Sequence, residues 1–163
     1  MSGAGPMSDD PHPARTRPYG YRADPAVPDF PDDRPIIVYD GHCALCTGWV
    51  RFVIRHDRAG RFRLLAAQSP LGQALYRHYG LDATAFETNI LIADGLPWFK
   101  LVGSVRMARG LGFPWSLAGL LGLLPRRLGE RLYDGVARNR IRLFGRHAAC
   151  HRPDPAEAWR FLA

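Results

Sequence analysis

Residues 35–54 constrain the fold most strongly, because a strand pattern gives way there to a helix pattern within a few positions. Residues 36–39 are Ile-Ile-Val-Tyr, a β-branched and aromatic run typical of a buried parallel strand. Asp40-Gly41 interrupts this run, and apolar residues from Cys46 onward recur at helical spacing. The sequence therefore predicts a strand–helix junction that carries Cys43 and Cys46 in a Cys-x-x-Cys spacing.

The elements that follow predict an α/β domain. Alternation, turn residues and capping residues indicate strands at 61–66, 89–93 and 98–101 and helices beginning at Ser69 and Ser104. Pro97 favours an edge position for the last of these strands. The resulting order, β-α-β-α-β-β-α, is thioredoxin-like. We expect a mixed four-stranded sheet with flanking helices.

We expect three parts along the chain. They are a flexible N-terminal tail over 1–34, a thioredoxin-like core over 35–112, and a helical C-terminal extension packed on the core over 113–163. Tyr19, Tyr21 and Phe30 are the tail residues that could pack onto the domain. Asp154 begins a capping-box pattern, which predicts a short final helix.

Charge and hydropathy leave several kinds of partner open. The net charge is +7, and Lys100 is the only lysine. A solvated basic surface is the plainest interpretation, with attraction to acidic partners, nucleic acid or anionic lipid as the alternative. The apolar stretch 111–124 contains Pro114 and is shorter than the ~20 residues of a membrane span. It predicts a buried or surface helix, and membrane-surface contact is the minor alternative.

The cysteine usage favours redox or metal chemistry. The N-terminus shows no basic start followed by an apolar stretch, so we expect a cytoplasmic location, where the thiol pool is reducing. Three cysteines do not make a disulfide framework. A close pair in a reducing compartment is typical of a redox-active or metal-binding site.

The strand–helix junction suits a redox dithiol. A helix N-terminus favours a thiolate on Cys43, which we expect to be exposed and to act as the attacking nucleophile. Cys46, one turn further on, should face the core and act as the resolving thiol. Asp40 either caps the helix or relays protons. His42 and Cys150 are possible modulators, His42 through its charge and Cys150 as a further redox thiol.

Two other classes of function remain open. A zinc site could combine Cys43 and Cys46 with ligands from the cluster His147, Cys150 and His151. Alternatively, a basic binding module could dock on phosphates or acidic surfaces. Its arginines would be Arg126, Arg127, Arg131, Arg138, Arg140, Arg142 and Arg146. Few aromatic residues lie among them, so we expect no specific nucleic-acid partner.

The stretch 38–46 resembles the signature of the DCC family of thiol–disulfide oxidoreductases, named for an Asp-Cys-Cys pattern that Asp40, Cys43 and Cys46 match. The resemblance covers roughly residues 35–153. Its downstream parts are Gly103-Ser104, Leu124-Pro125, Tyr133-Asp134, Arg138-Asn139-Arg140 and Gly145 to Cys150. It implies a thioredoxin-like fold and disulfide reductase activity. Thioredoxins proper carry a cis-proline before the third strand, whereas this chain has Thr88-Asn89 there.

The expected reaction is exchange of the Cys43/Cys46 dithiol with a protein or small-molecule disulfide, as in an enzyme of the protein-disulfide reductase type. The sequence holds no dinucleotide fingerprint, so we expect no bound cofactor. Electrons would then come from a partner reductase or a thiol pool.

Overall fold

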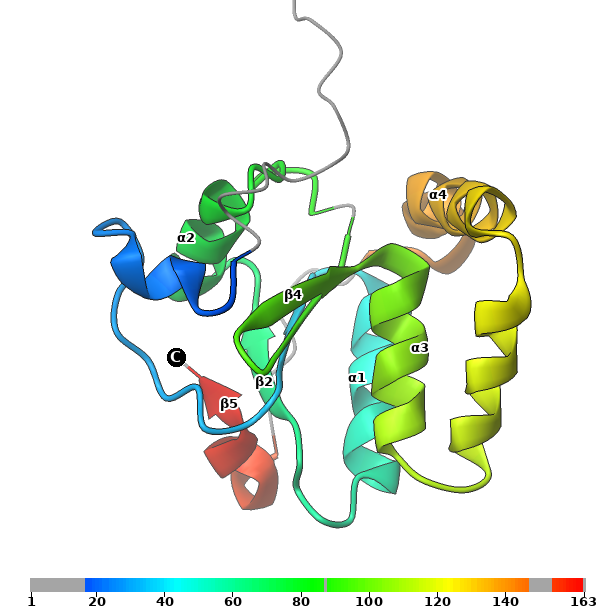
Figure 1. Cartoon of the computed structure of the whole chain (residues 1–163), viewed down its shortest axis with the longest axis horizontal. Coiled ribbons are helices and arrows are strands. Elements are labelled where there is room, and N and C mark those ends of the chain that lie inside the picture. Colours follow the sequence, from blue (N-terminus) through cyan, green and yellow to red (C-terminus); the bar gives the residue numbers. More distant parts are fainter. Residues whose placement is uncertain (1–16, 87, 147–153, 163) are drawn as a thin grey trace, which may run out of the picture.

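The computed structural model describes residues 17–86, 88–146 and 154–162. A mixed sheet forms its centre, with the strand order β4-β3-β1-β2-β5 (Figure 1). The strand β1 runs parallel to β2 and antiparallel to β3. The strands are β1 (Ile36–Tyr39), β2 (Arg63–Ala66), β3 (Ile90–Ala93), β4 (Leu96–Phe99) and β5 (Phe161–Leu162). As Pro97 predicted, β4 lies at an edge of the sheet.

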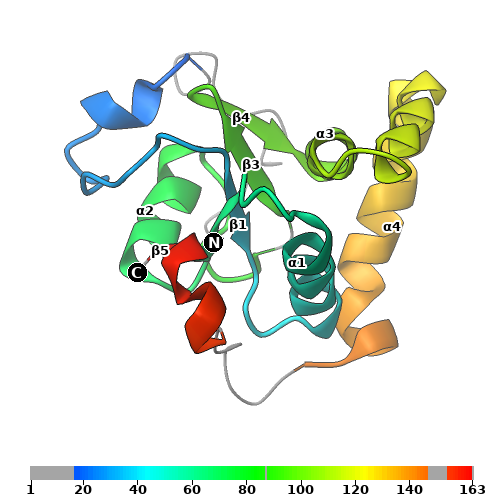
Figure 2. The same cartoon turned by 90° about the horizontal axis from the view of Figure 1, so that it is seen from below.

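Helices cover both faces of this sheet (Figure 2). The α-helices are α1 (Ala44–His56), α2 (Pro70–His78), α3 (Lys100–Gly110) and α4 (Arg126–Phe144), and the 3-10 helices are η1 (Gly20–Ala23), η2 (Trp115–Leu123) and η3 (Pro155–Arg160). Successive side chains of β1 point to opposite faces, so Ile36 and Val38 pack with α2, whereas Ile37 and Tyr39 pack with α1 and α3. The thioredoxin-like arrangement of the first four strands and three α-helices is therefore confirmed.

The helix starts are only partly as expected. Ser69 caps α2, because its hydroxyl accepts a hydrogen bond from the backbone N–H of Gly72 at 3.0 Å. Helix α3 begins at Lys100 rather than at Ser104. The backbone of Lys100 has φ +52°, and this turn lets the helix follow β4 without a connecting loop.

Residues 17–34 differ from the tail expected there. Tyr21 is buried in the hydrophobic cluster beneath α2, and Phe30 packs against the same cluster. The hydroxyl of Tyr21 donates a hydrogen bond to Asp32 at 2.7 Å. These aromatic side chains bury enough apolar surface to hold a segment whose overall composition is polar.

The C-terminal residues complete the sheet, which the sequence did not predict. The expected final helix is the 3-10 helix η3, which Asp154 caps, and it leads directly into β5. β5 pairs parallel with β2, so the sheet formed by the described residues has five strands rather than four. Arg160 anchors this end through a buried ion pair with Asp57 at 2.9 Å. A two-residue strand is too short to show alternation in a sequence.

The apolar stretch 111–124 forms η2, and none of the residues of η2 is buried. This 3-10 helix packs beside α3 on the outside of the molecule. Among the described residues, no helix combines the length and apolar character needed to cross a membrane.

Candidate functional site

The two cysteines lie where the sequence placed them, between β1 and α1. Cys43 is the N-cap of α1, and its sulfur accepts a hydrogen bond from the backbone N–H of Cys46 at 3.4 Å. The backbone N–H groups at the start of a helix have no intrahelical partner, so a negatively charged sulfur at the N-cap satisfies one of them. Asp40, the other candidate cap, does not cap the helix.

Cys43 is not exposed, and that expectation is wrong. Its exposed fraction is 0%, and that of Cys46 is 4%. The end of α4 lies against the start of α1: the N–H of Ala44 donates to the carbonyl of Gly145 at 3.3 Å, and Arg146 forms a β-bridge with Cys43. A helix N-terminus alone would be open to solvent, but this segment from the extension covers it.

Asp40 is a buried acceptor at the centre of a hydrogen-bond network. Its exposed fraction is 1%. One carboxylate oxygen accepts from Gln68 Nε2 at 2.6 Å and from the backbone N–H of His42 at 3.0 Å. The other accepts from Arg140 Nη2 at 3.2 Å. The network holds Asp40 in one position immediately before the dithiol.

Arg140 joins the parts of the site that are far apart in the sequence. Its guanidinium donates to Cys46 Sγ at 3.5 Å, to the Asp40 carboxylate, and to the carbonyls of Ala85 and Phe86 at 3.0 and 2.7 Å. The fork of an arginine suits this task because it offers several donors in fixed directions. α4 therefore supplies a buried positive charge to the dithiol.

Sequence reasoning did not assign this role to Arg140. Arg140 is one of seven late arginines, with no local feature to separate it from the others, and no motif in the sequence marks Gln68. The one signal was that Arg138-Asn139-Arg140 matches the DCC family pattern. Such a match marks a position in the chain without assigning a role to its side chain.

The environment makes the two sulfurs unequal. The pKa of Cys43 is lowered to about 6, first because Cys46 donates a side-chain hydrogen bond to it. The backbone N–H of Cys46 and the charge of Arg140 add to the lowering, while burial opposes it. The pKa of Cys46 is raised far above its usual value by that same hydrogen bond, by burial and by the negative charge of Cys43. At neutral pH the pair is therefore a thiolate on Cys43 and a thiol on Cys46.

The lowered pKa predicts a pH profile for alkylation. Only the thiolate reacts, so the rate at Cys43 should fall as the pH drops through about 6, well below the ordinary thiol range. Cys46→Ala removes the largest cause of the shift and should move the midpoint upward. Cys46→Ser keeps a donor and should move it less. Peptide mass spectrometry after iodoacetamide treatment measures the rate, and equal midpoints in all three proteins would contradict this account.

An apolar cavity of about 180 Å³ opens beside Cys46. The lining residues are Leu45, Cys46, Trp49, Asn89, Ser104, Tyr133, Val136, Ala137 and Arg140. Burial raises the pKa of Tyr133 to about 12, so its hydroxyl stays neutral. Asn89, at the position where thioredoxins have the cis-proline, forms part of the wall. Cys46 lines this cavity, and Cys43 is not among its lining residues.

The remaining site residues predicted from the sequence are His42 and the cluster His147, Cys150 and His151. His42 is half-buried beside the dithiol, and its role as a modulator stays a prediction. His147, Cys150 and His151 lie outside the described residues, and so does the zinc site that would use them. Over 17–86, 88–146 and 154–162, no three His, Cys, Asp or Glu side chains gather as metal ligands.

Comparison with known proteins identifies the family. A family model described as DCC1-like thiol–disulfide oxidoreductase matches residues 37–146. The chain is 33% identical over 127 residues to the uncharacterized protein YuxK of Bacillus subtilis (strain 168), which is 78% of this chain and 93% of that protein. It is also 33% identical over 120 residues to the DCC family protein At1g52590, chloroplastic, of Arabidopsis thaliana, covering 73% and 70% of the two chains. No solved structure matches. The chain belongs to the DCC1-like family of thiol–disulfide oxidoreductases, whose Asp-Cys-Cys pattern it carries at Asp40, Cys43 and Cys46.

Proposed function

We propose that Cys43 and Cys46 exchange their dithiol with a disulfide of a protein or a small molecule, in the manner of a protein-disulfide reductase. The observation that carries this proposal is the difference between the two sulfurs, with the pKa of Cys43 lowered and that of Cys46 raised. An attacking thiol needs a pKa near the ambient pH, whereas a resolving thiol must stay protonated until it is needed.

The exchange takes two steps. The Cys43 thiolate attacks one sulfur of the substrate disulfide, a mixed disulfide forms, and the other substrate sulfur leaves as a thiolate. Cys46 then loses its proton and attacks the mixed disulfide, which forms the Cys43–Cys46 disulfide and releases the second thiolate. The dithiol loses two electrons and the substrate gains them. A reductase or a thiol pool, which we place in the cytoplasm, returns the chain to its dithiol form.

The network around the cysteines favours the second step. Once Cys43 is bonded to the substrate, its negative charge is gone, and with it the hydrogen bond and the repulsion that raise the pKa of Cys46. Arg140, 3.5 Å from Cys46 Sγ, then stabilises the new thiolate. Asp40, linked to Cys46 through Arg140, is the acceptor that we propose for the proton.

The first step requires a change of conformation. Cys43 is fully enclosed, and the Gly145–Arg146 segment pairs with the start of α1 through the backbone. A substrate sulfur can approach Cys43 only after this segment moves away. Two backbone contacts of this kind are weak enough to open, since a hydrogen bond contributes about 0.5–1.5 kcal/mol net.

A redox titration followed by mass spectrometry tests the proposal. We expect a disulfide between Cys43 and Cys46 that forms with a midpoint potential between about −270 and −120 mV. A lowered thiolate pKa stabilises the reduced form and so raises the potential above about −270 mV. Because a pKa of about 6 is nearer to the ~7 found at −270 mV than to the ~3.5 found at −120 mV, the midpoint should lie closer to −270 mV. The same purified sample is assayed for metal. A pair that stays reduced across this range, or stoichiometric zinc released only when the thiols are modified, would contradict the proposed function.

A further inference from the structure

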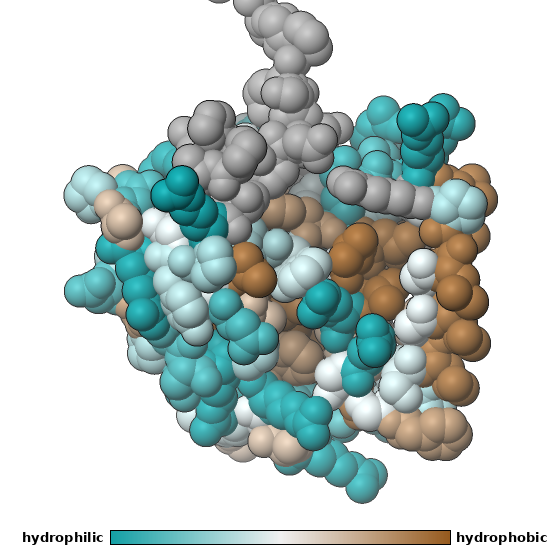
Figure 3. Space-filling view, in the orientation of Figure 1, coloured by the Kyte–Doolittle hydropathy of each residue, from teal (hydrophilic) through white to brown (hydrophobic). Residues whose placement is uncertain are grey.

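The outer surface of η2 is apolar and exposed. Phe113, two residues before η2, and Leu123, its last residue, are 83% and 82% exposed. Leu117, Leu120 and Leu121 between them are also exposed, and none of the residues from Trp115 to Leu123 is charged. Hydrophobic side chains gather over this part of the molecule at the right of Figure 3. A contiguous exposed patch of this kind marks an interaction surface.

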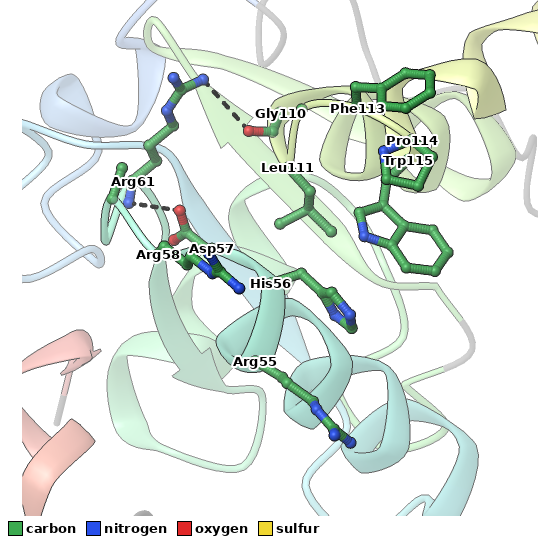
Figure 4. Close-up of a pocket in the computed structure, with 12 residues that line it drawn as sticks. Arg55, His56, Asp57, Arg58, Arg61, Gly110, Leu111, Phe113, Pro114 and Trp115 are labelled. Carbon is green, nitrogen blue, oxygen red and sulfur yellow. Dashed lines mark hydrogen bonds between the residues drawn. The ribbon is translucent and has the colours of Figure 1, made fainter.

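A basic cavity lies at one end of this apolar surface. It has a volume of about 520 Å³ and lies between the C-terminal end of α1 and the start of η2. Arg55, Arg58 and Arg61 line one part, and Pro114 and Trp115 line another (Figure 4). All three arginines are exposed to solvent.

The one acidic group in the cavity wall is already occupied. Asp57 accepts hydrogen bonds from the backbone N–H groups of Arg61 and Phe62, both at 3.0 Å, and forms the buried ion pair with Arg160. Its charge is therefore compensated inside the protein. The cavity presents a net positive charge beside an aromatic wall, which suits a phosphate group attached to an apolar body.

We propose that this chain binds the surface of an anionic phospholipid bilayer through η2 and the adjoining cavity. The exposed side chains of Phe113 and the η2 leucines enter the boundary between head groups and acyl chains. The arginines of the cavity receive a lipid phosphate. An apolar segment bordered by arginines is the pattern of proteins that lie on a membrane without crossing it.

The arrangement of charges favours a membrane over a second copy of the chain. A two-fold dimer through η2 would bring the same surface of each copy together. The arginines at the ends of this surface would then approach arginines of the other copy. They are Arg55 and Arg58 at one end and Arg127 and Arg131 at the other. Like charges brought together in this way oppose association. An anionic bilayer complements both ends at once.

The proposal also agrees with the position of the dithiol. Cys43 caps the N-terminal end of α1, whereas the cavity lies at the C-terminal end of the same helix. A helix of 13 residues separates the two sites by about 20 Å. A membrane bound at the cavity would leave the dithiol end of α1 clear for a substrate.

Co-sedimentation with vesicles tests the proposal. We expect the full chain to bind mixed phosphatidylglycerol–phosphatidylcholine vesicles and not vesicles of phosphatidylcholine alone. The double variants Phe113→Ser/Leu123→Ser and Arg55→Glu/Arg58→Glu should each weaken binding by about tenfold or more. All four side chains are exposed, so thermal unfolding and dithiol oxidation should stay as in the parent protein.

Arg77→Glu is the control for charge. Arg77 is exposed on α2, away from η2, and its substitution should leave vesicle binding nearly unchanged. Failure of the parent protein to bind anionic vesicles overturns the proposal. So does a loss of vesicle binding in the Arg77 variant equal to that in the Arg55/Arg58 variant, because it would indicate a diffuse attraction between the net positive charge of the protein and the membrane. Undiminished binding by the Phe113/Leu123 variant would also overturn it. The proposal would also be overturned if the parent protein formed a dimer in lipid-free solution, if this dimer did not bind vesicles, and if the Phe113/Leu123 substitutions dissociated it.

Discussion

Replacing Arg140 with methionine is expected to lower the free energy of unfolding of the reduced protein by about 3–5 kcal/mol, the cost of breaking a buried ion pair from one side. The change leaves the Asp40 carboxylate buried without its charged partner, and the carbonyls of Ala85 and Phe86 lose their donor. Urea denaturation under reducing conditions measures the loss. Because Arg140 also lowers the pKa of Cys43, the alkylation midpoint should rise in the same variant.

Arg138→Met is the matched control for this substitution. Arg138 lies on the same helix but is exposed, so its loss should change stability by no more than about 0.5 kcal/mol. In the double variant Asp40→Asn/Arg140→Met the Asp40 carboxylate is no longer left buried without its charged partner, and the loss should be smaller than the sum of the two single losses. If Arg140→Met costs no more than Arg138→Met, the network around Asp40 does not stabilise the fold.

Serine substitutions at the two cysteines are expected to have opposite consequences for trapping. Cys46→Ser removes the resolving thiol, so mixed disulfides with the substrate should accumulate through Cys43. Cys43→Ser removes the proposed nucleophile, so no mixed disulfide should form. Both variants should lose disulfide reductase turnover by at least about a thousandfold, the order expected when residues that act as a unit are broken.

Non-reducing electrophoresis and mass spectrometry of the adducts distinguish the roles. Cys150→Ser in the same background is the control, since a third thiol could form adducts of its own. Trapping by Cys43→Ser and not by Cys46→Ser would reverse the assignment. Cys46 would then be the attacking sulfur, reached through the cavity that it lines. No adduct with either variant would contradict exchange through this pair.

The sequence predicted what depends on neighbouring residues. The strand before Asp40, the junction at Cys43 and the cap at Ser69 each follow from a few adjacent side chains, and the structure has all three. Order along the chain was enough to predict the thioredoxin-like arrangement, because strand–helix–strand units and hairpins have few ways to pack.

What the sequence did not predict depends on residues far apart in the chain. Arg140 lies 100 residues from Asp40, and no local pattern separates it from the other arginines of α4. The burial of Cys43 depends on the segment Gly145–Arg146 that follows α4 rather than on the helix that Cys43 caps. The packing of Tyr21 was likewise hidden within a polar segment, because composition averages over single aromatic anchors.

The contribution of α4 to the dithiol also has a consequence for biosynthesis. Translation delivers Asp40, Cys43 and Cys46 about 100 residues before Arg140, at about 5–20 residues per second. For those seconds the nascent chain carries a cysteine pair without the guanidinium that lowers the pKa of Cys43 or the backbone of Gly145 that covers it. The thiols acquire their final pKa values and their cover only when the late helix docks, so until then the emerging polypeptide carries a cysteine pair that is less strongly activated at Cys43 and more accessible to other disulfides.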